Sequence, residues 1–520
     1  MKMKKVAAMG MAAVTALSML AGCGSSGGSS SSSSAEKTAE SGSAQATSDS
    51  GEAEDIVFAI PLSKTVDMSP IEDEVNKITE NKLNVHVKIE GISMANYSNQ
   101  VGLMMSGGEQ IDIVSWIGTY SSLIAKKQLM PMTDLIDQYG ADAKEVLGEE
   151  FLKSTTSNGD LYGLPVNNGK AAVLNLVIRK DLVEELNLPV DQLTQAADFD
   201  GYCKNLDLIT EMYAKIHEAH PEMACVVPSQ TNPNGFMITG VPFVDGLNDS
   251  FGVLMPGEDS KLENIYATSE FEKLCEYAYD WNQSGYVLED ATTTQETNNT
   301  YMQNNRAATF FITGEEGQAE QITTATGVDV ESIKLVEPYI TTASVNGIGF
   351  GISSTSKHPE AVMKFLNEMY SNADLVNLLD WGIEGVHYEV QDDGTVDFPE
   401  GVDASNTTYG LNMDWFFGNQ FLSKIWGKGR DTTIYERLEA NNKNAQFTPV
   451  MGFSYNSEPV STEIAAISNV TNQYLPGLQC GSLNPSETIP EFLQALDDAG
   501  INVVIEEKQK QLDEWKANNQ

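Results

Sequence analysis

Apolar positions between residues 55 and 115 repeat with a period that switches between that of a strand and that of a helix. The pattern predicts a strand at 55–60, a helix from Ser69, a strand at 85–89, a helix at 97–105 and a strand at 111–115. This β-α-β-α-β order is typical of an open α/β sheet. Ligands of such sheets bind beyond the carboxyl ends of the strands, so we expect a ligand loop at 116–120.

Two helix boundaries within this stretch carry local signals. Ser69 is placed to cap the first helix, Pro70 suits its first turn, and Glu72 would complete a capping box. Gly107 and Gly108 are expected to end the second helix, because glycine adopts the left-handed conformation of a helix end without strain.

Further helices and a hairpin are predicted toward the C-terminus. Pro359–Tyr370 has one apolar helical face, and Glu389–Phe398 is predicted to form a hairpin that turns at Asp392–Gly394. Pro490–Trp515 is a long helical pattern that Gly500 interrupts. We find no internal repeat, so the chain is not expected to be a solenoid or a propeller.

The first 22 residues have the features of a secretory signal peptide. Three lysines precede the apolar run Val6–Leu20, which is short for a membrane-crossing helix. The string Leu20-Ala-Gly-Cys23 resembles the lipobox of bacterial lipoproteins. That resemblance implies that Cys23 is diacylated on sulfur and becomes the mature N-terminus. An ordinary signal peptide that happens to end near a cysteine is the alternative.

Residues 24–54 are rich in serine, glycine, alanine, glutamate and threonine. Such a composition buries too little apolar surface to fold. We therefore expect a flexible tether between Cys23 and the globular part of the chain.

The charge of the chain narrows the range of partners. It has 74 acidic and 31 basic residues, a formal net charge of −43. Phosphates of nucleic acids would be repelled, so no nucleic-acid partner is expected. Solubility outside the cell is the simpler explanation for this charge. Beyond Cys23 there are four cysteines, Cys203, Cys225, Cys275 and Cys480, which we interpret as buried thiols, although disulfide pairing stays open.

Several stretches resemble the extracellular solute-binding proteins of ABC importers, in the branch that serves sugars. Four of them lie in the first part of the chain: Gly107–Trp116, Gln128–Leu135, Gly159–Pro165 and Asn304–Phe310. Three more, Trp381–Gly385, Pro449–Phe453 and Tyr474–Gly481, resemble a large lipoprotein subgroup with an extra, DUF3502-like C-terminal region.

This resemblance implies an α/β, two-lobed periplasmic-binding-protein-like (type II) fold with a hinge between the lobes. The predicted parts are a lipoprotein signal peptide (1–22), the lipidated Cys23 with its tether (23–54), lobe 1 (55–166), lobe 2 (167–348), a return to lobe 1 with a crossing insertion (349–440), and a C-terminal region that belongs mostly to lobe 2 (441–520).

Candidate ligand residues follow from the chemistry of a sugar. Its C–H faces suit aromatic rings, and its hydroxyl groups suit amides and carboxylates. Trp116 and Tyr120 follow a predicted strand, and Asn167 and Asn168 follow a hinge-like segment. The alternatives are that Trp116 packs inside its lobe and that the two asparagines are ordinary turn residues.

Two more candidate pairs lie in the C-terminal half. Trp381 and Glu384 form a ring-plus-acceptor pair on a glycine-flanked loop, with structural packing as the alternative. Trp415 is the preferred stacking platform in the densest aromatic and amide cluster of the chain, and Asn419 lies in the same cluster. Trp281 and Trp515 lie on helical patterns, and we expect both to pack against the core.

No catalytic motif is found. The segment His217–His220 has two histidines, but not at the spacing of a zinc protease, and neither a phosphate loop nor a nucleophile elbow is present. We therefore expect no enzymatic activity, no metal and no cofactor.

The sequence predicts a lipid-anchored, monomeric binding protein on the outer face of the bacterial cytoplasmic membrane. It would capture a carbohydrate, an oligosaccharide in our interpretation, and deliver it to the permease subunits of an ABC importer. A peptide or another polar solute is the alternative ligand, and a surface glycoside-degrading lipoprotein is the alternative class. Which sugar binds, and what the segment 385–449 does, stay open.

Overall fold

In the computed structural model, residues 53–171, 173–228, 240–314 and 316–519 are described. The predicted signal peptide, Cys23 and nearly all of the tether lie outside these residues. No helix in the described ranges is long and apolar enough to cross a membrane.

The first sheet and the helices packed on it are here called lobe 1. Its strands are β1 (Glu54–Leu62), β2 (Val85–Ser93), β3 (Ile113–Ile117), β6 (Leu164–Pro165) and β14 (Ile348–Ile352), and its helices are α1 (Ser69–Leu83), α2 (Tyr97–Gly107), α3 (Tyr120–Ala125), α4 (Thr133–Tyr139), α5 (Ala141–Lys153), α12 (Pro359–Ser371) and α13 (Ala373–Asp380). The strand order is β2-β1-β3-β14-β6. β1 is parallel to β2 and β3, and β14 is antiparallel to β3 and β6. The predicted β-α-β-α-β start is confirmed, with β3 beginning two residues later than expected.

The predicted capping box at the start of α1 is wrong. The N-cap position belongs to Met68, and no side chain caps the helix. The Glu72 carboxylate instead accepts a hydrogen bond from the backbone N–H of Ile89 at 2.7 Å. Asn76 pairs in the same way with both backbone groups of Val87. Because β2 is the edge strand of the sheet, its outward backbone groups need such partners, and the α1 side chains supply them.

The second sheet, with its helices, is here called lobe 2. Its strands are β7 (Val173–Arg179), β8 (Ala224–Val226), β11 (Ala307–Gly314) and β12 (Val330–Lys334), and its helices are α6 (Lys180–Leu186), α7 (Phe199–Ala219), α8 (Ser269–Gln283), α9 (Asn298–Gln303) and α10 (Gln318–Thr326). The order is β12-β7-β11-β8, with β7 antiparallel to β11 and β12 and β8 parallel to β11.

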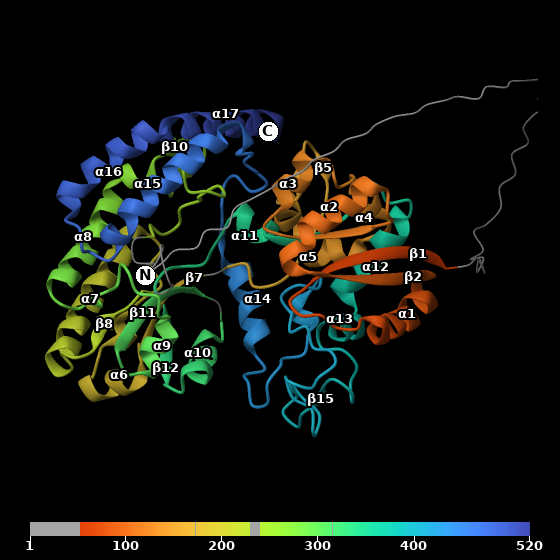
Figure 1. Cartoon of the computed structure of the whole chain (residues 1–520), viewed down its shortest axis with the longest axis horizontal. Helices are drawn as coiled ribbons and strands as arrows, with labels where there is room; N and C mark the ends of the chain where they lie inside the picture. The colour runs from red at the N-terminus through yellow and green to blue at the C-terminus, as the bar shows by residue number, and fades with distance from the viewer. Residues whose placement is uncertain (1–52, 172, 229–239, 315, 520) are drawn as a thin grey trace, which may run out of the picture. The chain divides into compact units, whose positions relative to one another are not determined.

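Three C-terminal helices extend lobe 2: α15 (Ser461–Gln479), α16 (Pro485–Ala499) and α17 (Ile501–Asn519). They lie along one side of lobe 2, in blue in Figure 1, where α15 and α16 pack against α8 and α17 packs against α15 and α16. Gly500 separates α16 from α17 with a φ of 94°, as the sequence predicted. A short antiparallel pair, β9 (Val253–Leu254) and β10 (Leu262–Glu263), lies against α17.

The described chain passes between the sheets at three places. β6 leads to β7, and β12 leads through β13 (Tyr339–Ile340) and α11 (Thr342–Asn346) to β14. The third passage runs through α14 (Ile434–Asn444) and β17 (Gln446–Phe447), which pairs in parallel with β13. It joins Phe417 in the core of lobe 1 to Val450 in the core of lobe 2.

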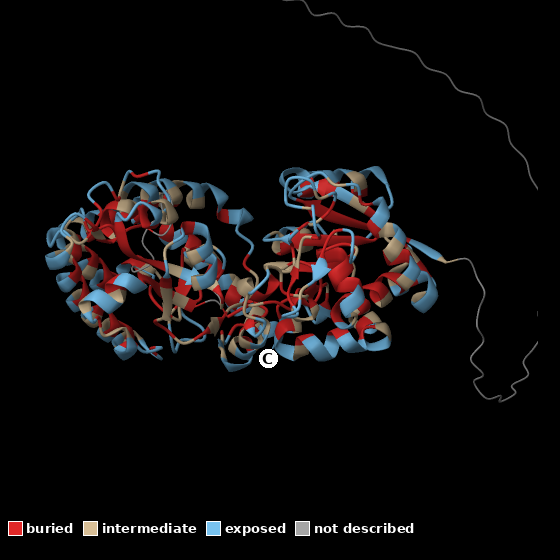
Figure 2. Ribbon diagram, turned by 90° about the horizontal axis from the view of Figure 1, so that it is seen from below, coloured by how far each residue is buried: buried red, intermediate tan, exposed pale blue. Residues whose placement is uncertain are grey.

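Each lobe has its own apolar core, which Figure 2 shows as buried strands and inner helix faces. Trp281 is 1% exposed in the core of lobe 2, and Trp515 packs edge-on against Phe453, so both predicted packing roles are confirmed. All four cysteines of the body are free thiols, and Cys225, Cys275 and Cys480 are buried as predicted, whereas Cys203 is only half-buried. The predicted helix at 359–370 and the hairpin formed by β15 (Glu389–Val390) and β16 (Val396–Asp397) are confirmed. The remaining short strands, β4 (Thr156–Ser157) and β5 (Asp160–Leu161), form one small antiparallel pair.

Candidate functional site

A cavity of about 510 Å³ lies at the carboxyl ends of β1 and β2. Ser63 and Lys64 directly follow β1, and Met94 directly follows β2. The rest of the wall comes from the segment between α13 and α14. We call this cavity the aromatic pocket, because four aromatic side chains line it: Trp381, Phe398, Trp415 and Trp426. Its place at strand ends is where open α/β sheets bind ligands.

The aromatic rings of this pocket differ in how they are held. Trp381 is 2% exposed and donates its indole N–H to the carbonyl of Lys424 at 3.0 Å. Its ring lies 5.1 Å from that of Trp426, which meets Phe398 edge-on at 4.8 Å. Trp415 is half-buried and touches Phe416 edge-on. Trp381 therefore forms a fixed base, and Trp415 retains surface that can contact a ligand.

The predicted candidates Asn167, Asn168 and Asn419 meet beside this pocket. The Asn167 side-chain amide donates to Oδ1 of Asn419 at 3.0 Å, and the two residues also form an isolated parallel bridge. Asn168 donates to the carbonyl of Trp415 at 2.9 Å. The Asn168 Oδ1 atom is buried and has no hydrogen-bond partner among the described residues. These amides bind other parts of the protein, and their predicted contact with a ligand stays a prediction.

Asn442 of α14 fastens the same crossing segment from the other side. Its Oδ1 atom accepts hydrogen bonds from the backbone N–H groups of Lys170 and Ala171, at 2.8 and 3.1 Å. Its amide donates to the carbonyl of Asn168 at 2.7 Å. One buried side chain thus satisfies three backbone groups in the passage between the lobes, and sequence reasoning missed it.

A second cavity, of about 490 Å³, lies beyond the carboxyl end of β3. We call it the polar pocket, because most of its lining residues carry a hydroxyl, amide or carboxylate group. These residues are Gly118–Ser122, Ala125, Asn248, Asp249, Ala343, Asn346, Gly347 and Tyr455–Glu458. Its wall thus combines α3 and α11 with a loop of lobe 2 and the start of the C-terminal region. Ser121 and Ser454 join two of these walls through a hydrogen bond of 2.7 Å between their hydroxyl groups.

Trp116 and Tyr120 lie on the lobe 1 side of the polar pocket. Trp116 is 1% exposed and donates its indole N–H to the carbonyl of Asn346 at 2.7 Å. A Cβ atom at Gly163 or Gly349 would lie 2.3 or 2.4 Å from the Trp116 ring, so these glycines make room for it. Tyr120 lines the pocket and donates its hydroxyl to Thr155 at 2.7 Å. Trp116 supports the pocket wall from behind, and its direct contact with a ligand stays a prediction.

Glu384 lies apart from both pockets. It is exposed, and it bridges to Tyr388 within its own loop. Burial, together with the Glu384 carboxylate, raises the pKa of Tyr388 to about 12. The joint role of Glu384 and Trp381 in ligand binding stays a prediction.

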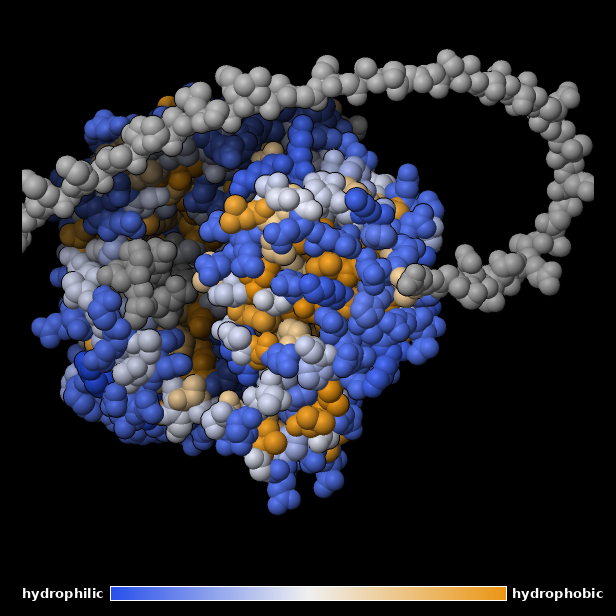
Figure 3. All heavy atoms as spheres, turned by 45° about the vertical axis from the view of Figure 1, so that its right-hand side comes forward, coloured by the Kyte–Doolittle hydropathy of each residue, from blue (hydrophilic) through white to orange (hydrophobic). Residues whose placement is uncertain are grey.

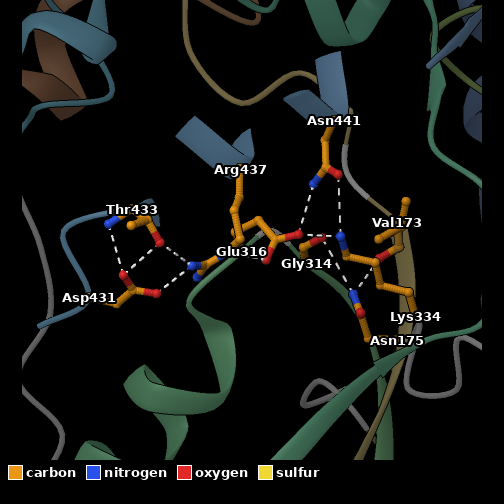
Figure 4. Close-up of polar contacts among 9 residues, drawn as sticks. All are labelled: Val173, Asn175, Gly314, Glu316, Lys334, Asp431, Thr433, Arg437 and Asn441. Carbon is orange, nitrogen blue, oxygen red and sulfur yellow. Dashed lines mark hydrogen bonds and ion pairs between the residues drawn. The ribbon is translucent and has the colours of Figure 1, made fainter. Parts of the chain in front are cut away.

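A charged cluster lies at the carboxyl ends of β11 and β12 in lobe 2, where it meets α14 (Figure 4). The Glu316 carboxylate pairs with Lys334 and accepts hydrogen bonds from Asn441 and Arg437, both at 3.1 Å. Arg437 also pairs with Asp431. Burial acts to raise the pKa of Glu316, but the hydrogen bonds and charges of these partners outweigh it and hold the pKa below its usual range. Glu316 is therefore ionised, and its ion pairs and hydrogen bonds join α14 to lobe 2.

Sequence reasoning missed several pocket residues, and one of them carried a usable signal. Lys64 directly follows the first strand, so the rule that selected 116–120 would have selected it. No comparable signal marks Phe398, Trp426 or Tyr455, because each lies in a long loop that reaches its pocket only in the folded chain.

Hydrophilic side chains cover most of the face shown in Figure 3, and apolar side chains gather there in separate patches. The large apolar residues with the most exposure in the described chain include Leu103, Val386 and Val503. They lie in α2, in the loop between α13 and β15, and in α17. The exposed apolar residues of the described chain are thus spread over separate parts of the sequence.

Comparisons with known proteins agree with this architecture. Residues 449–517 match a domain of unknown function, DUF3502. A carbohydrate ABC transporter substrate-binding protein of Streptococcus pneumoniae is 26% identical over 457 residues, which cover 85% of this chain and 87% of the relative.

Two solved structures show the same fold. The N-glycan transport solute binding protein NgtS of Streptococcus pneumoniae has a TM-score of 0.71 at 22% identity, covering 90% of this chain and 100% of NgtS. A solute binding protein of Bifidobacterium longum infantis, described as HMO binding, has a TM-score of 0.61 at 15% identity, covering 89% of this chain and 99% of that one. The family described as "Bacterial extracellular solute-binding protein" matches residues 63–375, more than half of the chain, and the chain belongs to this family.

Proposed function

We propose that this protein is the lipid-anchored binding subunit of an ABC importer, that it captures an oligosaccharide, and that it delivers the sugar to the membrane permease. The family consists of solute-binding proteins and not of enzymes, so a glycoside-degrading activity is set aside. The observation that carries the carbohydrate assignment is the aromatic pocket at the carboxyl ends of β1 and β2.

The aromatic pocket has the two kinds of surface that a sugar needs. The rings of Trp415 and Trp426 offer apolar faces to the C–H groups of a pyranose. The side chains of Ser63, Lys64 and Asn412 offer polar groups to its hydroxyls. A peptide would need partners for its backbone amides as well, and no open sheet edge is among the described lining residues.

The relatives support the same ligand class. The Streptococcus pneumoniae relative is described as a carbohydrate substrate-binding protein, and NgtS has been solved in complex with Man1GlcNAc and Man5GlcNAc. These names describe those proteins, and we extend to this chain only the class, a carbohydrate of more than one unit.

The anchor and the way of working complete the proposal. Cys23 would carry the lipid, and the serine-rich tether would hold a monomeric binding body away from the membrane. For the parts of the chain, we propose the boundaries expected from the sequence: 1–22, 23–54, 55–166, 167–348, 349–440 and 441–520. A ligand that contacts both lobes stabilises their closed arrangement, and the permease would sense that arrangement.

The test is thermal unfolding of the purified protein against neutral oligosaccharides, oligouronates, peptides and polyamines. A ligand at 100 times its dissociation constant stabilises the folded state by roughly 2.7 kcal/mol, which raises the unfolding midpoint. We expect a shift with one class of oligosaccharide. A shift with peptides or polyamines alone would sink the carbohydrate assignment and leave the binding protein standing.

A further inference from the structure

The C-terminal helices match a domain of unknown function, and one face of α17 bonds to residues that line the polar pocket. Lys508 is completely buried, pairs with Asp249 and donates to the carbonyl of Gly252 at 3.0 Å. Gln511, one turn later, bonds both backbone groups of Asn456 at 3.0 Å. Asp249 and Asn456 both line the polar pocket. One turn of α17 therefore holds two separate segments of its wall.

Two groups at this wall lack partners that a buried polar atom normally has. Tyr455 lines the pocket and is 3% exposed, and its hydroxyl has no hydrogen-bond partner among the described residues. The Oδ2 atom of Asp249 is also buried and unpaired within the described chain. Leaving such atoms unsatisfied costs free energy, so a site of this kind points to a ligand that supplies the missing bonds.

The charges around the polar pocket select against one kind of ligand. Asp249 and Glu458 line it, and no lysine or arginine is among its described lining residues. Lys508 lies behind the wall and is already paired with Asp249. Because Lys508 balances the charge of Asp249, a sugar that carries a carboxylate would face mainly the carboxylate of Glu458, which has no ion pair among the described residues. The described residues hold no group of three metal-binding side chains either.

We infer that the C-terminal region is a binding element, and that it builds with α3 a second subsite for the hydroxyl groups of an uncharged sugar unit. Tyr455 and Asp249 contact the sugar from the lobe 2 side. Tyr120 and Ser122 lie on the lobe 1 side. Lys508 and Gln511 are positioning residues that hold this wall in place. The inference rests on the proposed function. It adds the location of a second subsite and the expectation that the sugar unit bound there is uncharged.

The experiment measures the affinity of the purified protein by calorimetry, using neutral hexose and N-acetylhexosamine oligosaccharides and oligouronates of equal length. Tyr455→Phe removes only the unpaired hydroxyl, so the fold should stay intact. We expect it to weaken the binding of neutral oligosaccharides roughly three- to tenfold, the range of one hydrogen bond. Tyr474→Phe is the matched control in the same region, where the ring stacks on Phe492, and it should bind as the wild type does.

Charge selection is tested with Glu458→Gln, which changes an exposed side chain. It should improve the binding of oligouronates severalfold and leave neutral binding nearly unchanged. If Tyr455→Phe and Glu458→Gln both bind as the wild type does while Trp415→Ala loses affinity, the subsite is refuted and the proposed function stands. If no oligosaccharide binds the wild type, the proposed function fails and the subsite fails with it.

Discussion

Asn167 and Asn419, 252 residues apart in the sequence, hydrogen-bond to each other through their side chains at 3.0 Å. Both were selected from the sequence as possible ligand contacts. Asn419 also accepts from the backbone of Phe421 and donates to the carbonyl of Tyr370, so its amide connects three segments. The pair fastens the first passage between the lobes to the segment that carries Trp415.

Asn419→Ala should lower the free energy of unfolding by about 1–3 kcal/mol, because the buried partners of the amide lose their bonds. Chemical denaturation measures this change. Asn518→Ala, at an exposed position of α17, is the control and should leave the free energy of unfolding unchanged within error. Equal stability of both variants would show that the Asn167–Asn419 pair does not hold the passage.

Trp415→Ala should weaken the binding of an oligosaccharide roughly tenfold or more, equivalent to about 1.4 kcal/mol, because the half-buried ring is the stacking surface. The measurement is titration calorimetry with an oligosaccharide that raises the unfolding midpoint. Trp515→Ala removes a partly buried tryptophan outside both pockets, and it should lower stability without changing affinity. If both variants bind as tightly as the wild type, the ligand does not stack in the aromatic pocket.

Stability should fall in acid partly through the Glu316 cluster. The pKa of Glu316 lies below its ordinary value of 4.5, and Arg437 and Thr433 lower the pKa of Asp431 to about 2. Since both folded-state values lie below the unfolded ones, the stability they contribute is present above pH 4.5 and is lost as the pH falls toward 2.

Glu316→Gln should therefore have a lower unfolding midpoint than the wild type at neutral pH. Between pH 4.5 and about 2, its midpoint should fall by less than that of the wild type. Thermal unfolding across this range measures the difference. Glu320→Gln, at an exposed site on α10, should follow the wild type. Parallel curves for Glu316→Gln and the wild type would mean that the cluster contributes nothing in the folded state.

Asp380 at the end of α13 should have the opposite effect to Glu316, because it should lower the stability of the fold as the pH rises. It is fully buried, its Oδ1 atom has no partner among the described residues, and it pairs closely with the hydroxyl of Ser423. Burial raises the pKa of Asp380 well above 3.8, and the nearby Asp414 carboxylate raises it further. The unfolded chain releases this proton above pH 3.8 while the folded chain keeps it, so stability falls as the pH rises from there.

Asp380→Asn keeps the size of the side chain and removes its ionisation. We expect it to raise the unfolding midpoint by a few degrees at pH 7, and the gain should vanish at about pH 2, well below 3.8, where the wild-type carboxyl is neutral in both states. An effect of the same size at both pH values would contradict this account.

The framework of the fold could be predicted because its signals are local. The strand–helix alternation at 55–115, the stop at Gly108 and the break at Gly500 each depend on a few neighbouring residues, and the structure confirms them. The capping box at Ser69 failed for the opposite reason. Glu72 has a stronger partner in the edge strand β2, which a local rule does not consider.

The candidate site was less predictable because its contacts join distant parts of the chain. Trp415 could be selected by composition, and the structure places it in an aromatic pocket. Asn442 has no distinguishing neighbours in sequence, and its role depends on Lys170 and Ala171, 272 and 271 residues away. Tyr455 stands out only once α17 is seen to hold its segment.

The measurement that tests the central claim most directly is a titration of intrinsic tryptophan fluorescence with neutral oligosaccharides, in the wild type and in Trp415→Ala. A sugar that stacks on Trp415 should change the wild-type emission in a saturable way, and the variant should lose most of that change and bind more weakly. A saturable response to peptides or polyamines but to no oligosaccharide would contradict the assignment of a carbohydrate ligand. An identical response of the two proteins to an oligosaccharide would contradict its placement in the aromatic pocket.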